Sequence, residues 1–534
     1  MTILLAVDLL HQERCMHIGV DVGGTNTDAA LMDGSKVLAS IKSPTTSNIG
    51  SGVVGAVRSV LDQSGVDVSQ ITSVMIGTTQ FTNAFVEGKR LVPVATFRAA
   101  LPATESLLPM VEFPKHLADP IGRVSYLVRG GYEFDGREIS PLDEDAVAEA
   151  ARDMKKRGIK SAALSCVFTP INDAMEKRMA EIILAEAPGT QLTLSSELGR
   201  VGLIERENAT IMNASLTDLA EAVVNAFRSA LAELNLTCPF YISQNDGTLM
   251  SAEFAEKYPV LTFASGPTNS MRGAAFLSGI KDGIVVDIGG TTSDVGVLKD
   301  GFPRESAISV DIGGVRTNFR MPDVLAIGLG GGSIVRQTED GLTIGPDSVA
   351  LNLLTEALVF GGKTLTTTDI AVAAGYADIG DKSLVAHLDM AMVAEAVELM
   401  HVMIEDAVDR VKSGKGNVPV ILVGGGSVLL NRNLKGASEV INPELSGTAN
   451  AIGAGLAQVG GEVDKIYSYA TLGRDELIAQ AKQEAIERAV NAGADRASIS
   501  IVNLEELPLA YLPAGAVRIK TKAIGDLAQE GVAQ

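Results

Sequence analysis

The chain has 534 residues, of which 46% are hydrophobic, and its 65 acidic and 44 basic side chains give a formal net charge of −21. This length and composition predict a globular protein of roughly two to four domains with a large core. The acidic balance argues against a binding surface for nucleic acid, and no apolar run of about 18 residues is present to span a membrane. We therefore expect neither nucleic acid nor a membrane as a partner.

The three cysteines, Cys15, Cys166 and Cys238, are widely separated and form no C-x-x-C motif. An odd number of isolated cysteines is typical of a reduced compartment, and they supply no zinc site. We therefore expect a cytoplasmic protein.

Strands and helices alternate through the first 200 residues. The segment 50–62 places Val53, Val57 and Val60 on one helical face, and short apolar runs on either side of it predict strands. The stretch 100–140 is richer in Pro and Gly and predicts an irregular excursion. The predicted elements are strand 36–42, helix 50–62, strand 71–76, helix 145–157, strand 161–168, helix 173–186 and strand 191–195. This alternation indicates an α/β fold.

Two segments carry the same motif, 17-HIGVDVGGTNTDAALMDG-34 and 283-GIVVDIGGTTSDVGVLKDG-301. In each, a β-branched run leads to an acid, Asp21 or Asp287, then to x-Gly-Gly-Thr. A second acid, Asp28 or Asp294, follows seven positions after the first. The copies lie 266 residues apart (287 − 21), which is too long for a stacked array of repeats. The repeat therefore predicts two related domains that face each other.

Each copy predicts a strand that ends in Asp and leads into a tight glycine hairpin. Because Gly has no Cβ, the backbone can approach a polyphosphate and its N–H groups can converge on the anion. Such turns also join strands that bind no ligand, but two copies with the same acids favour phosphate binding. Asp21 and Asp287 suit the shell of a Mg²⁺ ion or the activation of a water, and with Asp28 they are the candidate catalytic residues. The candidate phosphate ligands are Gly23, Gly24, Thr25, Asn26 and Thr27 in the first copy and Gly289, Gly290, Thr291 and Thr292 in the second.

Two further glycine stretches follow the second copy. The first, 327-IGLGGGSI-334, predicts either a nest of backbone donors or a hinge. The second, 420-VILVGGGSVLL-430, predicts either a cofactor contact or a strand-to-helix turn. Their candidate cofactor residues are Gly330, Gly331 and Gly332, and Gly424, Gly425 and Gly426.

The two phosphate motifs are followed by the stretch 420–430, which would be an adenosine motif. This order of motifs resembles the actin, Hsp70 and sugar-kinase superfamily. This resemblance implies an α/β fold in which two RNase H-like ATPase-clamp domains hold ATP between them. We assign the lobes to 17–200 and 201–462. A small C-terminal α/β extension, 463–534, follows, with a helix predicted over 475–492 and a strand over 499–504.

Several stretches are similar to the hydantoinase A and 5-oxoprolinase family: 77-GTTQFTNAF-85, 195-SSELGRVGLIERENATIMNA-214, 244-QNDGTLMS-251, 263-FASGPTNSMRGAA-275 and 327-IGLGGGSI-334. The resemblance implies ATP-dependent opening of a cyclic amide or imide, such as a hydantoin, oxoproline or related lactam. The carbonyl oxygen is phosphorylated, and water then attacks the activated carbon. The resemblance also implies ATP and Mg²⁺, a hydantoinase B-like second subunit and an oligomer. Thr78, Thr79 and Asn83 would line the cleft as substrate residues; outside this family they would be turn and capping residues.

The chain departs from longer members of this family. Ile76 and Leu325 stand where those members have histidines, and residues 345–369 replace a Pro-Gly-Pro-Ala-Cys-Tyr-Gly stretch. Without these ligands the cleft offers carboxylates and hydroxyls, which favour hard ions. We therefore predict no tightly bound zinc or manganese, and Mg²⁺ that arrives with nucleotide, with Asp323 as a third candidate carboxylate.

Two other functions stay open on the same fold. A small-molecule kinase would need an acceptor hydroxyl beside a catalytic Asp and would release a phosphorylated product. An ATPase subunit would instead hydrolyse ATP to move its lobes, and so activate or remodel a partner.

Overall fold

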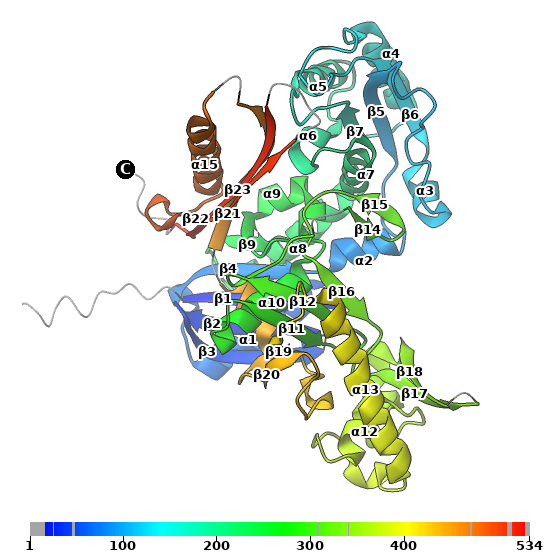
Figure 1. Cartoon of the computed structure of the whole chain (residues 1–534), viewed down its shortest axis with the longest axis vertical. Coiled ribbons are helices and arrows are strands. Elements are labelled where there is room, and N and C mark those ends of the chain that lie inside the picture. The colour runs from blue at the N-terminus through cyan, green and yellow to red at the C-terminus, as the bar shows by residue number, and fades with distance from the viewer. Residues whose placement is uncertain are drawn as a thin grey trace, which may run out of the picture.

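The computed structural model describes residues 16–24, 26–44, 49–306, 309–339, 341–456, 458–469, 472–509 and 515–528. The predicted phosphate ligand Thr25 lies outside these residues. Within them, the chain forms two large sheets, a separate four-stranded sheet and two small hairpins (Figure 1).

The first large sheet starts as an antiparallel meander, continues with two parallel strands and ends in strands of mixed direction. The spatial order from one edge is β3 (Lys36–Pro44), β2 (Asn26–Asp33), β1 (Met16–Val22), β4 (Ile71–Thr78), β9 (Phe240–Ser243) and β10 (Leu249–Ser251), followed by β21 (Gln458–Ser468), β23 (Ala516–Asp526) and β22 (Ser500–Pro508). β2 runs antiparallel to β1 and β3, β4 is parallel to β1, and β9 is parallel to β4. β10 is antiparallel to β9 and parallel to β21, and β23 is antiparallel to both β21 and β22. Side chains alternate along β1, so Ile18 and Val20 share a core with Val53 of α1 (Ile49–Ser64), whereas Gly19 faces α14 (Ala449–Ala454).

The second large sheet repeats the strand order of the first. Its path is β13 (Phe302–Pro303), β12 (Ser293–Lys299), β11 (Gly283–Ile288), β19 (Val418–Val423) and β20 (Ala437–Ile441), and β16 (Val324–Ile327) also pairs with β12. β12 is antiparallel to β11, and β19 and β20 continue in parallel. The two copies of the sequence motif therefore occupy the same place in two sheets of the same topology.

Two helices, one packed on each sheet, meet at backbone contact. α10 (Ser265–Ser278) packs on the second sheet, and α14 packs on β1 and β2 of the first. A Cβ on Gly273 of α10 would overlap the carbonyl oxygen of Ala449, and one on Gly453 of α14 would overlap the carbonyl oxygen of Asn269. Glycine at these positions therefore sets how closely the two helices approach.

A parallel four-stranded sheet is inserted between β4 and β9. Its order is β6 (Val124–Arg129), β5 (Val94–Leu101), β7 (Ser161–Cys166) and β8 (Gln191–Leu194). The stretch 100–140, which we predicted to be irregular, contains α3 (Lys115–Ile121) and β6. Pro114 directly before α3 and Pro120 within it mask this regular structure in the sequence.

At the C-terminal end, β21, β23 and β22 extend the first sheet, and α15 (Arg474–Asn491) covers one face of them (Figure 1). Ala481, Ala485 and Ala489 of α15 are buried against this face, and a Cβ on Gly461 of β21 would overlap the carbonyl oxygen of Ala485. The predicted domain boundaries at residues 200 and 462 stay a prediction.

The strands and helices predicted from the sequence are present, with ends displaced by a few residues. Among the described residues, no helix combines the length and apolar character needed to cross a membrane. The remaining elements are α2 (Gln80–Val86), α4 (Glu144–Lys156), α5 (Ala174–Glu186), α6 (Ser195–Leu198), α7 (Leu203–Ala214), α8 (Thr217–Glu233), α9 (Ala252–Lys257), α11 (Leu353–Glu356), α12 (Thr367–Ala373), α13 (Met390–Val411), β14 (Val310–Ile312), β15 (Val315–Thr317), β17 (Ser333–Thr338) and β18 (Gly341–Ser348).

Candidate functional site

The two motif hairpins have matching backbones. Asp21 pairs with Asp28 across β1 and β2, and Asp287 pairs with Asp294 across β11 and β12. The turn is closed in the same way in both, by an N–H···O bond of 3.0 Å from Gly23 to Asn26 and of 2.9 Å from Gly289 to Thr292. The two copies of the sequence motif thus form hairpins with the same strand pairing and the same turn.

The first acids of the two hairpins lie close enough for their charges to interact. Burial raises the pKa of Asp21, hydrogen bonds from Asn269 and Asn450 oppose this, and the charge of Asp287 raises it further. The two amide nitrogens lie 3.3 Å and 3.1 Å from the carboxylate oxygens of Asp21. Burial also raises the pKa of Asp287, against a hydrogen bond from Ser270. Consecutive residues of α10, Asn269 and Ser270, therefore contact the acids of different lobes.

The second acids complete a cluster of four carboxyl groups. Burial raises the pKa of Asp28 to about 6 against the opposing charge of Lys42, whose Nζ lies 2.5 Å from Asp28 Oδ2. Burial, reinforced by the charge of Asp287, raises the pKa of Asp294 to about 7. The other oxygen of Asp28, Oδ1, is buried and has no hydrogen-bond partner among the described residues. One or two of these carboxyl groups could supply oxygen ligands to a cation.

Both later glycine stretches pack against the second hairpin. The N–H groups of Gly331 and Gly332 donate to the carbonyls of Gly289 and Gly290 at 3.0 Å and 2.7 Å, and Gly426 donates to Ile288 at 2.8 Å. These stretches thus bring the predicted cofactor glycines of the second lobe together. The N–H groups of Gly331, Gly332 and Gly426 therefore support the hairpin backbone, whereas those of Gly330 and Gly424 donate to the Ser333 hydroxyl and the Ser446 carbonyl. Their part in cofactor binding stays a prediction.

The predicted substrate residues follow β4 at the edge of the same site. Thr78 pairs with Val22 at the end of β1, and its carbonyl accepts a 3.1 Å bond from Ser265 at the start of α10. Thr79 donates its N–H to Val22, and the Asn83 amide lies 3.4 Å from the Thr79 hydroxyl. Asn83 is exposed, whereas Thr78 is buried. The structure therefore places Thr78 and Thr79 beside the first hairpin and Asn83 one helical turn beyond them.

The predicted third carboxylate does not join the cluster. Asp323 forms an ion pair of 2.6 Å with Arg304, and it is not among the charges that act on Asp21 or Asp287. Ile76 and Leu325 lie within strands, where they pair with Val20 and Val295. Within the described part of the chain, no three His, Cys, Asp or Glu side chains are grouped as in an all-protein metal site. The paired carboxylates and the unpartnered Asp28 oxygen still fit Mg²⁺, which commonly binds through one or two carboxylates, waters and phosphates.

Four residues at the site escaped the sequence analysis: Lys42, Asn269, Ser270 and Asn450. Asn269 and Ser270 lie in the stretch 263–275 that carries the family resemblance, which was the signal available for them. Asn450 lies 429 residues from Asp21, and Lys42 reaches Asp28 through strand register, so neither leaves a local pattern.

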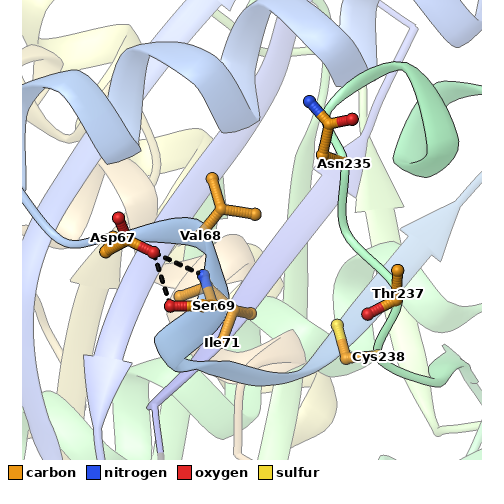
Figure 2. A pocket seen from close by; sticks show the side chains of 7 residues that line it. All are labelled: Asp67, Val68, Ser69, Ile71, Asn235, Thr237 and Cys238. Atoms are coloured by element: carbon orange, nitrogen blue, oxygen red, sulfur yellow. Dashed lines mark hydrogen bonds between the residues drawn. The ribbon is translucent and has the colours of Figure 1, made fainter.

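A separate cavity of about 370 Å³ lies at the other end of the first sheet (Figure 2). Figure 2 shows Asp67, Ser69 and Ile71 around the start of β4 and Cys238 just before β9. The length of β4 separates this cavity from Thr78, about 20 Å at the usual rise per residue. Since ligands of open α/β sheets bind at the carboxyl ends of parallel strands, the hairpin end is the candidate site.

Two models of one protein family match this chain. The Hydantoinase/oxoprolinase N-terminal region matches residues 17–187, and Hydantoinase/oxoprolinase matches residues 206–381. The chain belongs to the hydantoinase/oxoprolinase family. The predicted family is therefore confirmed, and the matched regions contain both hairpins.

Several curated relatives of this hydantoinase/oxoprolinase chain are named as enzyme subunits. Caprolactamase subunit alpha of Pseudomonas jessenii is 27% identical over 390 residues, which are 67% of this chain and 54% of the relative. Acetophenone carboxylase gamma subunit of Aromatoleum aromaticum is 26% identical over 409 residues, 69% of this chain and 54% of the relative. The chain thus spans about half the length of the curated relatives it matches.

Solved structures of the same family share the fold. The ATP-dependent caprolactamase from Pseudomonas jessenii superimposes with a TM-score of 0.78 at 19% identity, over 96% of this chain and 88% of that chain. Nucleotide-free acetone carboxylase gives a TM-score of 0.68 at 18% identity over the same shares. The predicted fold class is confirmed: an α/β protein with two ATPase-clamp domains of RNase H-like topology and a small C-terminal α/β extension.

Proposed function

We propose that this chain is an ATP-dependent hydrolase that opens a cyclic amide or imide, such as a hydantoin, oxoproline or a related lactam. One observation carries the proposal: two matched phosphate-type hairpins from separate lobes bring Asp21 and Asp287 into one buried site. Family membership supports it, because a relative of the same fold is an ATP-dependent caprolactamase. ATP is the second substrate in this proposal.

The hairpin turns at Gly23–Asn26 and Gly289–Thr292 would hold the phosphates from opposite sides, since glycine turns admit an anion close to the backbone. Asp21 and Asp287 would hold Mg²⁺, and Asn269 and Asn450 orient the Asp21 carboxylate for it. The nucleotide supplies a phosphoryl group, which makes the amide carbonyl carbon open to attack by water.

Two acids are suited to move a proton in this reaction. A general base works best when its pKa lies near the working pH, and burial raises the pKa of Asp28 to about 6 and of Asp294 to about 7. We assign the activation of the attacking water to Asp28, on the first hairpin. Thr78 and Thr79 would contact the ring, because Thr78 ends β4 beside that hairpin and Thr79 follows it.

A second candidate function is an ATPase subunit that serves a partner enzyme. The observation in its favour is that several relatives are named as subunits of larger enzymes, a caprolactamase and two carboxylases. We propose a hydantoinase B-like second subunit for this chain under either function, and an oligomeric assembly.

The test uses purified protein with ATP, Mg²⁺ and a panel of hydantoin, 5-oxoproline and caprolactam, each with and without the second subunit. Phosphate release and products are followed together by colorimetry and mass spectrometry. A ring-opened product formed in step with phosphate supports the hydrolase. A phosphorylated product would replace it with a kinase, and phosphate release that no amide stimulates would replace it with the ATPase subunit.

A further inference from the structure

Lys42 is a flexible, charged side chain at the place where the two lobes meet. It lies on β3 directly opposite Asp28 of β2, and its Nζ forms the 2.5 Å ion pair with that acid. Its Cε lies 3.7 Å from the position that a Cβ on Gly425 would occupy. Gly425 belongs to the glycine stretch of the second lobe, so Lys42 lies where the two lobes meet.

The charge of Lys42 acts on acids from both hairpins. Burial raises the pKa of Asp21, Asp28 and Asp287, and the Lys42 ammonium group opposes this at all three. The Lys42 side chain is 34% exposed, whereas that of Asp28 is 1% exposed. A lysine with one partly hydrated end and a flexible four-carbon stem can change partner without refolding the strand that carries it.

A magnesium nucleotide would change what this cation has to neutralise. Mg²⁺ brings two positive charges to the carboxylates, and the terminal phosphate brings negative charge to the same cleft. The Lys42 ammonium group then stabilises the Asp28 carboxylate less than before, and it stabilises the terminal phosphate more. A point charge on a lysine is a common contact for phosphate oxygens in nucleotide-binding proteins.

We propose that Lys42, the ion-pair partner of Asp28 in this structure, becomes the contact for the terminal phosphate when a nucleotide binds, so that it lets the site distinguish a nucleoside triphosphate from a diphosphate. This inference rests on the proposed nucleotide site and adds the residue that determines its phosphate specificity. The exchange forms and breaks no covalent bond. It also frees the Asp28 carboxylate, whose Oδ1 already has no partner among the described residues, for the water that it is proposed to activate.

The test compares Lys42→Met with Lys36→Met, which removes an exposed lysine from the other end of the same strand. Affinities for the magnesium complexes of a non-hydrolysable ATP analogue and of ADP are measured by calorimetry. A charged hydrogen bond supplies about 1.5–3 kcal/mol, so Lys42→Met should weaken analogue binding roughly 10- to 100-fold. ADP binding should change by less than about threefold. Lys36→Met should bind both nucleotides as the wild type does.

A merely structural role would weaken both nucleotides equally in Lys42→Met, and that result, or no loss at all, overturns the inference while leaving the nucleotide site intact. If the wild type binds neither nucleotide, the proposed function fails and this inference fails with it. Lys42→Met leaves the buried Asp28 unpaired, so Lys42→Met/Asp28→Asn is the second variant and keeps the test valid when the single variant fails to fold. It should bind ADP and the analogue with similar affinity, and a retained preference for the analogue would refute the role of Lys42.

Discussion

Asp294 offers a direct test of the electrostatics of this cleft. Burial and the neighbouring Asp287 charge raise its pKa to about 7 from an ordinary 3.8, so the folded protein holds this proton more tightly than the unfolded chain does. Stability from a raised carboxyl pKa is fully present below the unfolded value and is lost as pH rises through the folded one. The contribution of Asp294 to the unfolding free energy should therefore decline between about pH 4 and pH 7.

Replacing Asp294 by Asn removes that decline, because the amide cannot ionise. A displacement of roughly three pKa units corresponds to about 4 kcal/mol for a fully dry group. The Asp294 side chain is half-buried, so solvent screening reduces the expected gain to about 2 kcal/mol at pH 8. Near pH 4 the variant and the wild type should have similar stability.

The assay is thermal and urea unfolding without nucleotide, in chelator, at pH 4, 6 and 8. Asp300→Asn is the matched control, because Asp300 is exposed in the turn that follows the same strand. It also has a positive φ, which Asn tolerates. A gain for Asp294→Asn that is equal at all three pH values, or a loss of stability at pH 8, would show that this carboxylate is not held at an unfavourable charge.

Three further outcomes are expected. Asp21→Asn and Asp287→Asn should fold, since each amide can keep hydrogen bonds. Both variants should lose Mg²⁺-dependent ATP turnover by at least about 100-fold. Full turnover in both variants, with unchanged circular dichroism, would show that these acids do not belong to the site. Chelator-free protein should contain no stoichiometric zinc or manganese, because the described cleft offers carboxylates and amides; one equivalent by elemental analysis contradicts this. Gly453→Ala should cost about 1–3 kcal/mol or more by forcing apart α14 and α10, whereas Gly447→Ala, with open space at its Cβ, should be nearly neutral in the same unfolding assay.

The repeat in the sequence predicts a large part of this fold for a physical reason. A β-branched run, an Asp and a glycine turn specify one hairpin locally, and two copies specify two equivalent lobes. Hence the positions of Asp21, Asp28, Asp287 and Asp294 could be inferred without coordinates, and the hairpins do share one backbone geometry.

What the sequence could not predict depends on contacts between distant segments. Lys42 meets Asp28 only through the register of β2 and β3, and Asn450 meets Asp21 only because α14 crosses α10. The glycines at 330–332 have the composition of an anion nest, but the N–H groups of Gly331 and Gly332 donate to the second hairpin and that of Gly330 donates to Ser333. Composition indicates which backbone groups could bind a ligand, and packing determines which of them are already occupied.

The two halves of the cleft are related in backbone but not in charge, and this difference matters for the ligand. In the first lobe, Lys42 pairs with Asp28; in the second, the charge that acts on Asp294 is another carboxylate, Asp287. A cleft with two identical halves would not favour either orientation of a polyphosphate. A cation on one side and an unneutralised acid on the other favour one orientation, with the more negative end of the ligand toward Lys42. In the proposed nucleotide site, the two copies of the motif therefore form the two sides of the cleft. Lys42, which belongs to the first lobe alone, determines the orientation of the bound polyphosphate.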